Sequence, residues 1–217
     1  MEKTGEKTYR IITGGEALLE DHGSLIPKAL IEAYPWSRAE GAEDYRPYTT
    51  AQMACLPEFL YVRMETAEDD PKAQERGFSG EVYTDSCMEL FLMPDPEHSP
   101  DYFNWEFNAE GAMYLSLGSD RFNRRDINPE DYMSFFRVRP ERRPGRWSVE
   151  YRILHEFIRS YFPDYKPEEG WRMKGNFYKC GEKTKYPHYG CFAWIDLPEP
   201  DFHSPGFFGT FIIEKGL

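Results

Sequence analysis

The sequence predicts an all-β fold: an antiparallel β-sandwich, immunoglobulin-like or jelly-roll-like, with one short helix. Short apolar runs of strand length recur along the chain, and Pro and Gly residues are spread between them rather than gathered into a linker. Aromatic residues make up 17% of the chain and fall in nearly every segment, so burial can offset the entropy of ordering it. We expect one domain over residues 1–217, with residues 1–30 an N-terminal extension or an edge strand.

The first elements are a hairpin and a buried strand. Residues 51–64 predict two strands that turn around Pro57. Residues 85–93 are apolar at nearly every position, which predicts a strand covered on both faces and ended by Pro94. Glu89 lies inside this run, and a carboxylate there needs either a structural arginine or a ligand as its partner. The sequence pattern around Glu89 is compatible with either partner.

Residues 102–108 alternate strictly between aromatic and polar side chains. The aromatic residues 103, 105 and 107 share one face, and Asn104, Glu106 and Asn108 share the other. Amides and a carboxylate on a rigid strand suit sugar hydroxyls, which both donate and accept hydrogen bonds. The alternative, which is commoner for antiparallel sheets, is an outer face that only meets water.

The remaining elements complete the predicted sheet. Residues 154–162 form the predicted helix, which Pro163 ends. We assign Trp105, Trp147 and Trp194 to the core, because each lies in an apolar strand pattern. The other predicted strands are 112–117, 146–153, 171–180, 189–194 and 207–213.

Charge and cysteine content exclude several classes of partner and site. A net charge of -12 without a basic stripe disfavours nucleic acid, and no stretch is apolar enough to span a membrane. The first seven residues carry charges where a signal peptide needs an apolar core, so we expect a cytoplasmic location, or an extracellular one if the N-terminus was trimmed. The four cysteines lack paired zinc-ligand spacing, and we expect free buried thiols, with a Cys180–Cys191 bridge as the alternative.

Two charged loops each have two interpretations. The acidic residues after the first hairpin indicate a solvated loop, although clustered carboxylates can also hold calcium. They are Glu65, Glu68, Asp69 and Asp70. A basic loop containing Arg121, Arg124 and Arg125 offers partners for a buried glutamate or a ligand, or is simply solvated.

Three segments together, 85–91, 107–111 and 193–209, resemble family 9 carbohydrate-binding modules in their order and spacing. The resemblance covers the chain from the first hairpin onward. It implies a β-sandwich with structural calcium that binds carbohydrate without cutting it. It also implies a plant-polysaccharide ligand of xylan or glucan type and a glycoside hydrolase as a partner. The chain resembles most closely an uncharacterised branch that carries the sequences of residues 176–180, 188–189 and 202–203, and we expect these residues to line a modified pocket.

The resemblance also implies a site. In the family two tryptophans clamp a sugar ring, and here their positions fall at Val82–Tyr83 and on Phe202. We therefore expect Tyr83 and Phe202 to stack on the sugar, and Lys179 to pair with Glu106, which replaces a family arginine. The expected polar contacts are Glu89, Glu106, Asn108, Lys179 and His203.

Two other functions are weighed against binding. Glu89 and Glu106 offer the carboxylate pair of a glycoside hydrolase, but no nucleophile motif, phosphate loop or metal-spaced histidine cluster accompanies them. Haem or redox binding is the third hypothesis, and its ligand types occur without a recognisable arrangement. They are Met53, Met64, His188 and His203.

Overall fold

The computed structural model describes residues 7–36 and 45–216, whose strands form one continuous sheet. The thirteen strands are β1 (Thr8–Thr13), β2 (Lys28–Ile31), β3 (Thr49–Cys55), β4 (Phe59–Thr66), β5 (Cys87–Met93), β6 (Tyr102–Asn108), β7 (Met113–Gly118), β8 (Arg124–Asp126), β9 (Arg139–Arg143), β10 (Arg146–Leu154), β11 (Arg172–Cys180), β12 (Tyr189–Cys191) and β13 (Gly209–Glu214). Their order is β8-β7-β6-β5-β11-β13-β1-β3-β4-β10-β9, with β12 beside β11 and β2 beside β3.

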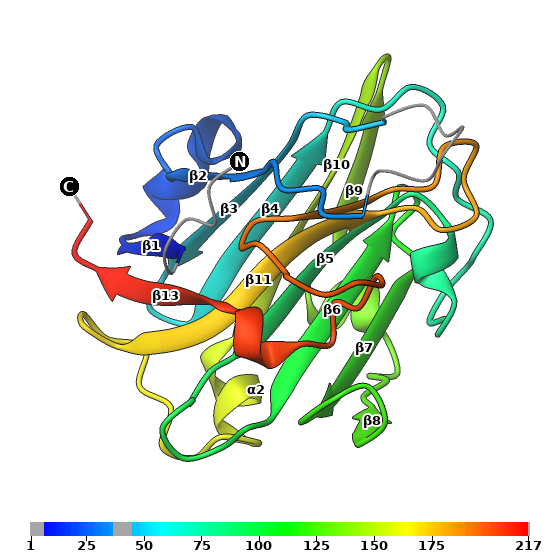
Figure 1. Ribbon diagram of the computed structural model, residues 1–217. Helices are drawn as coiled ribbons and strands as arrows, with labels where there is room; N and C mark the ends of the chain where they lie inside the picture. Colours follow the sequence, from blue (N-terminus) through cyan, green and yellow to red (C-terminus); the bar gives the residue numbers. More distant parts are fainter. Residues whose placement is uncertain (1–6, 37–44, 217) are drawn as a thin grey trace.

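The all-β class is confirmed, with a correction to the strand directions. The sheet curls so that its β5–β7 part faces its β4–β10 part (Figure 1). These facing parts correspond to the layers of the expected sandwich, but hydrogen bonding through β13, β1 and β3 joins them into one sheet. The sheet is mixed rather than antiparallel, because β1 pairs in parallel with both β13 and β3.

The N-terminal segment contributes an interior strand. The sequence predicts an extension or an edge strand over residues 1–30, yet β1 has a hydrogen-bonded neighbour on each side. Alternation explains how it fits, since Tyr9 and Ile11 are buried in the core while Thr8 and Arg10 are exposed. Residues 1–6 of this expected segment lie outside the described residues.

Helices are short in the described part of the chain. The predicted helix over 154–162 is confirmed as α2 (His155–Arg159), and α1 (Tyr132–Phe135) is a second one that the sequence analysis missed. The 3-10 helices are η1 (Glu16–Gly23), η2 (Val82–Thr84) and η3 (Pro205–Phe207). No helix among the described residues has the length and apolar character needed to cross a bilayer.

The main core lies between the two facing parts of the sheet. The rings of Phe107 on β6 and Tyr151 on β10 meet across it with centroids 4.7 Å apart. Trp105 and Trp147 are fully buried there, as predicted. Trp194 is 38% exposed, which corrects its assignment to the core. It lies beyond the end of β12 at Cys191, so the strand alternation no longer sets its direction.

The outer face of β5, β6 and β11 is also covered. A second apolar cluster joins strand residues such as Phe91 and Tyr178 to Val82 of η2 and to the loop residues Phe202 and Phe208. Every residue of β5 is buried, which confirms the strand covered on both faces. The hairpin is confirmed as β3 and β4, and the four cysteines are free and buried as expected.

Candidate functional site

A pocket of about 190 Å³ opens beside this second cluster. Five of the seven predicted site residues line it, namely Tyr83, Glu89, Glu106, Phe202 and His203. The other lining residues are Gly80, Phe91, Arg121, Arg124, Cys180, Glu182, Tyr189 and Pro200. The structure therefore gathers most of the predicted residues at one place, from strands and loops far apart in the sequence.

Strand register explains the pocket floor. Glu89 on β5 lies directly opposite Glu106 on β6, and Cys87 lies opposite Cys180 on β11. Opposite residues in antiparallel strands project from the same face, and so do residues two apart on one strand. Glu89, Glu106 and Cys180 consequently share the outer face of the sheet, where they form the floor.

The two floor carboxyl groups are buried side by side. Burial raises the pKa of Glu89 well above its usual range, and the neighbouring Cys180 thiol and Glu106 act in the same direction. Burial also raises the pKa of Glu106 to about 7, although Arg124 opposes the shift. Burial therefore favours the protonated form of Glu89, while Glu106 lies near its midpoint at neutral pH.

Hydrogen bonds leave one buried carboxyl oxygen of this pair without a partner. The Cys180 thiol donates to Glu89 Oε1 at 2.9 Å, and Asn104 Nδ2 donates to Glu106 Oε1 at 2.8 Å. Glu106 Oε2 is buried and has no hydrogen-bond partner among the described residues. A buried oxygen in this state is costly unless a ligand or a water bonds it.

His203 orients an arginine at the pocket wall. Its Nε2 lies 2.7 Å from Arg124 Nη1, and its Nδ1 lies 2.8 Å from the Tyr102 hydroxyl. A guanidinium only donates, so Nε2 accepts and the proton resides on Nδ1. Burial and the charge of Arg124 lower the pKa of His203 to about 3. His203 is thus a neutral imidazole that holds Arg124 in place.

The aromatic residues are arranged less simply than two parallel plates. Phe202 stacks on Tyr178 with centroids 4.0 Å apart and an interplanar angle of 10°, so one of its faces is already covered. Tyr189 meets Phe202 at 75°, and Tyr83 is half-buried at the pocket wall. The open aromatic surface of the pocket therefore comes largely from Tyr83 and Tyr189.

Lys179 corrects one expectation. It does not pair with Glu106. Its neighbours on β11, Tyr178 and Cys180, lie on the outer face of the sheet, so strand alternation turns Lys179 into the core. There its Nζ lies 3.2 Å from Glu68 Oε2 and 2.7 Å from His188 Nε2. Lys179 is a buried structural cation that neutralises Glu68.

Asn108 lies outside the pocket lining and shapes the adjoining loops. Its Nδ2 donates to Asp85 Oδ2 at 3.0 Å and to the Glu75 carbonyl, and its Oδ1 accepts from the backbone of Glu110 and Ala112. These bonds occupy the amide on both sides. Asn108 thus secures the loop before η2 that carries Tyr83.

Cys180 and Tyr189 line the pocket, as the branch-specific segments led us to expect. Sequence reasoning missed other lining residues, namely Gly80, Glu182 and Pro200. The basic loop was a usable signal, since Arg121 and Arg124 reach the pocket, whereas the exposed Arg125 lies over the Tyr161 ring instead.

The acidic loop does not fit calcium at Glu65 or Glu68. Glu68 accepts from Ser86 and Trp147 and pairs with Lys179, and Glu65 lies 2.8 Å from Arg63. Calcium needs carboxylate oxygens that are not already paired with cations. Asp69 and Asp70 are exposed, as a solvated loop predicts.

The residues considered for haem do not converge. Met53 and Met64 are buried in the main core. Both ring nitrogens of His188 are occupied, by Lys179 and by the Tyr186 carbonyl. His203 is bonded at both nitrogens as well. These side chains leave no pair of axial ligands facing a common cavity.

Comparison with known proteins agrees with the architecture. A candidate carbohydrate-binding protein from Bacteroides uniformis ATCC 8492 is similar, with a TM-score of 0.78 and 26% identity over 96% of this chain and 100% of that one. Two structures of a family 9 module from Caldicellulosiruptor kristjanssonii, in complex with glucose and with cellotriose, share the fold at 13% identity. Their TM-scores are 0.66 and 0.65, over 96% of this chain and 96% and 94% of theirs.

A search of curated proteins found no match. The family model described as "Carbohydrate-binding family 9" matches residues 19–213. That match spans the curled sheet from η1 to β13 and includes every residue that lines the pocket. On this evidence the chain belongs to carbohydrate-binding family 9.

Proposed function

We propose that this protein is a non-catalytic module that binds carbohydrate in the pocket floored by Glu89 and Glu106. The observation that carries the proposal is the pocket itself, whose lining combines two half-buried tyrosines with two buried carboxyl groups. Its volume of about 190 Å³ is below the roughly 300–1,000 Å³ of pockets for drug-sized ligands, which suits a single sugar ring.

The polar groups of the floor match the needs of a sugar. A protonated Glu89 can donate a hydrogen bond, and the unpartnered Glu106 Oε2 can accept one. Sugar hydroxyls do both, so a ring lying over the floor satisfies an oxygen that the protein leaves unpaired. Tyr83 and Tyr189 would supply the apolar contact with the ring face.

The ligand that we propose is an oligosaccharide of the glucan or xylan type. The relatives crystallised with glucose and cellotriose support the glucan choice. We further propose that a glycoside hydrolase is the partner that profits from such binding. Catalysis by Glu89 and Glu106 is the weaker alternative, because a glycoside hydrolase needs one ionised carboxylate of the pair, whereas burial raises the pKa of both.

Calorimetry with glucose, cellotriose and xylotriose tests the proposal. We expect saturable binding at millimolar concentration or tighter. Tyr83→Ala should weaken it about tenfold, equivalent to about 1.4 kcal/mol of lost stacking. Tyr48→Ala is the matched control, because Tyr48 is 66% exposed and lies outside the pocket lining.

Two outcomes would count against the proposal. One is the absence of any heat with all three sugars from correctly folded protein, and the other is an equal loss of affinity in Tyr83→Ala and Tyr48→Ala. Hydrolysis of the same oligosaccharides, lost in Glu106→Gln while binding persists, would favour the enzyme instead.

A further inference from the structure

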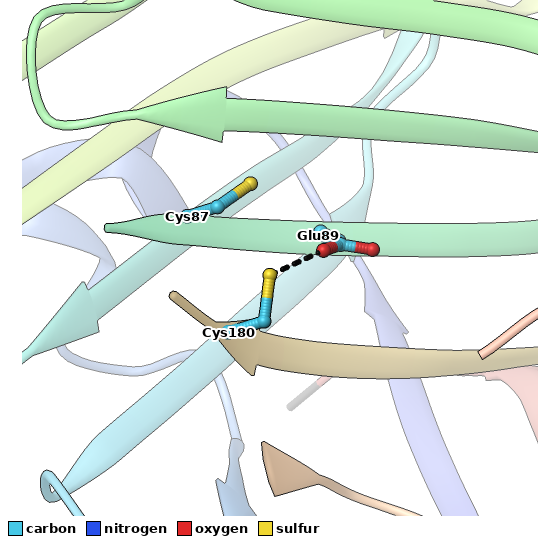
Figure 2. A group of neighbouring side chains, drawn as sticks. All are labelled: Cys87, Glu89 and Cys180. Carbon is cyan, nitrogen blue, oxygen red and sulfur yellow. Dashed lines mark hydrogen bonds between the residues drawn. The ribbon is translucent and has the colours of Figure 1, made fainter. Parts of the chain in front are cut away.

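We propose that Cys87, Glu89 and Cys180 form a binding site for a thiophilic divalent cation, zinc being the best match, at the pocket floor. Figure 2 shows Cys87 and Glu89 on β5 and Cys180 on β11, with the Cys180 sulfur pointing at Glu89. One ligand atom from each lies within 4.8 Å of the others, and all three residues are buried. The inference does not depend on sugar binding, but it shares Glu89 with the proposed sugar pocket, and a bound ion would replace the proton that Glu89 offers to a sugar.

Strand register builds the site without any loop. Cys87 and Cys180 are directly opposite on β5 and β11, and Glu89 follows Cys87 by two positions on the same face. Cross-strand neighbours hold their Cβ atoms about 4.5–5.5 Å apart, so the backbone itself sets the spacing of the ligands. This also explains why the sequence gives no zinc signature, since the two cysteines are 93 residues apart in the chain.

The donor set matches the chemistry of zinc. Thiolates and a carboxylate bind Zn²⁺ at about 2.3 Å and 2.0–2.2 Å, and three protein ligands with one open position are typical of zinc sites that also hold water or a ligand. The Cys180 thiol already points at Glu89 Oε1, 2.9 Å away, so an ion would take the place of the proton between them. Calcium and magnesium prefer oxygen ligands and fit poorly.

The fourth coordination position would face the pocket, because Glu89 and Cys180 both line it. Glu106 provides an independent sign of a missing partner there. It is 4% exposed, lies directly opposite Glu89 and leaves Oε2 without a hydrogen bond. A water bound to the ion on the pocket side could donate to this oxygen, as groups around zinc ligands commonly accept such bonds.

Cobalt and zinc titrations of the whole protein provide the test. Metal-free protein kept reduced should bind one Co²⁺ and develop sulfur-to-cobalt charge-transfer absorption in the near ultraviolet, which one equivalent of Zn²⁺ removes. Cys180→Ser should weaken zinc binding at least about 100-fold, more than the loss of a group around the ligands typically does. Cys191→Ser is the matched control, since Cys191 is equally buried but bonds the Ala33 carbonyl.

Several results would overturn the site. They are wild-type protein without a thiolate–cobalt signal, equal losses in Cys180→Ser and Cys191→Ser, or a Cys87–Cys180 disulfide in freshly purified protein. Glu89→Gln keeps both thiols and should lower zinc affinity while circular dichroism stays unchanged, so a misfolded serine variant does not decide the matter. Sugar calorimetry on metal-free protein is run separately, so failure of one proposal is distinguishable from failure of the other.

Discussion

Individual residues of the site owe their chemistry to the face from which they project. The alternation of β6 could be predicted from sequence because aromatic and polar residues take turns, and Glu106 indeed lies on the polar face. Lys179 could not be placed in the same way. Alternation separates it from Cys180, but only the register with β5 decides which of the two faces the pocket. The polar face of β6 is buried rather than exposed to solvent, and the local sequence pattern does not indicate this either.

At this scale the buried Glu106 should make stability depend on pH. Its pKa is about 7 in the folded protein against about 4.5 unfolded, so the stability contributed by the protonated form is fully present below pH 4.5 and is lost as pH rises through 7. Glu106→Gln removes this loss. As pH rises from about 5 to 8, the difference in unfolding free energy between the variant and wild type should therefore shift by roughly 2–3 kcal/mol in favour of the variant.

Urea unfolding at both pH values measures this effect. Glu97→Gln, at an exposed position, provides the comparison and should track wild type. A stability gap between Glu106→Gln and wild type that stays constant with pH would show that Glu106 does not titrate where we expect.

Among the elements, β1 shows most clearly that long-range strand pairing is not predictable from local sequence. Its own alternation marks it as a strand, and the antiparallel hairpin β3–β4 could be predicted from local turn signals. Its parallel partner β13 starts about two hundred residues later, and no local pattern indicates such a pairing. The same limitation led us to expect an antiparallel sandwich where the strands form a mixed, continuous sheet.

The junction between β1 and β2 along β3 gives a prediction for this element. The pairing with β2 ends at Gln52 and that with β1 begins at Ala54, so the Tyr9 hydroxyl caps the Met53 N–H between them at 2.7 Å. Tyr9→Phe removes that acceptor from a buried donor and should lower the unfolding free energy by about 1–3 kcal/mol.

Thermal or urea denaturation monitored by circular dichroism tests this, with Tyr48→Phe as the control at an exposed position. Equal stabilities for the two variants would mean that the Met53 N–H finds another acceptor. The Tyr9 hydroxyl would then not stabilise the place where β1 and β2 meet along β3.

For the whole molecule, charge and pocket chemistry can be separated experimentally. The chain carries a net charge of -12, yet Arg121 and Arg124 stand at the pocket wall. A neutral sugar has no charge for these arginines to attract over a distance. Its affinity should therefore change less than about twofold between roughly 0.05 M and 0.5 M salt. Calorimetry with cellotriose at both salt concentrations tests this expectation.

A uronic-acid-bearing xylo-oligosaccharide is the informative counterpart. If the pocket prefers such an acidic ligand, its affinity should exceed that of the neutral sugar at low salt and fall steeply as salt rises. That outcome would contradict our proposal of a neutral ligand. It would mean that Arg121 and Arg124 select an acidic ligand directly.

The pairing of β1 with β13 also bears on how the protein is made. During translation Tyr9 has no partner on that side until its counterpart Phe211 has left the ribosome, roughly 10–40 s later at 5–20 residues per second. For that time the nascent chain carries an open strand edge, which is a template for wrong pairing with other chains. Closure of the sheet therefore waits for the synthesis of β13, and until then this edge of β1 stays unpaired.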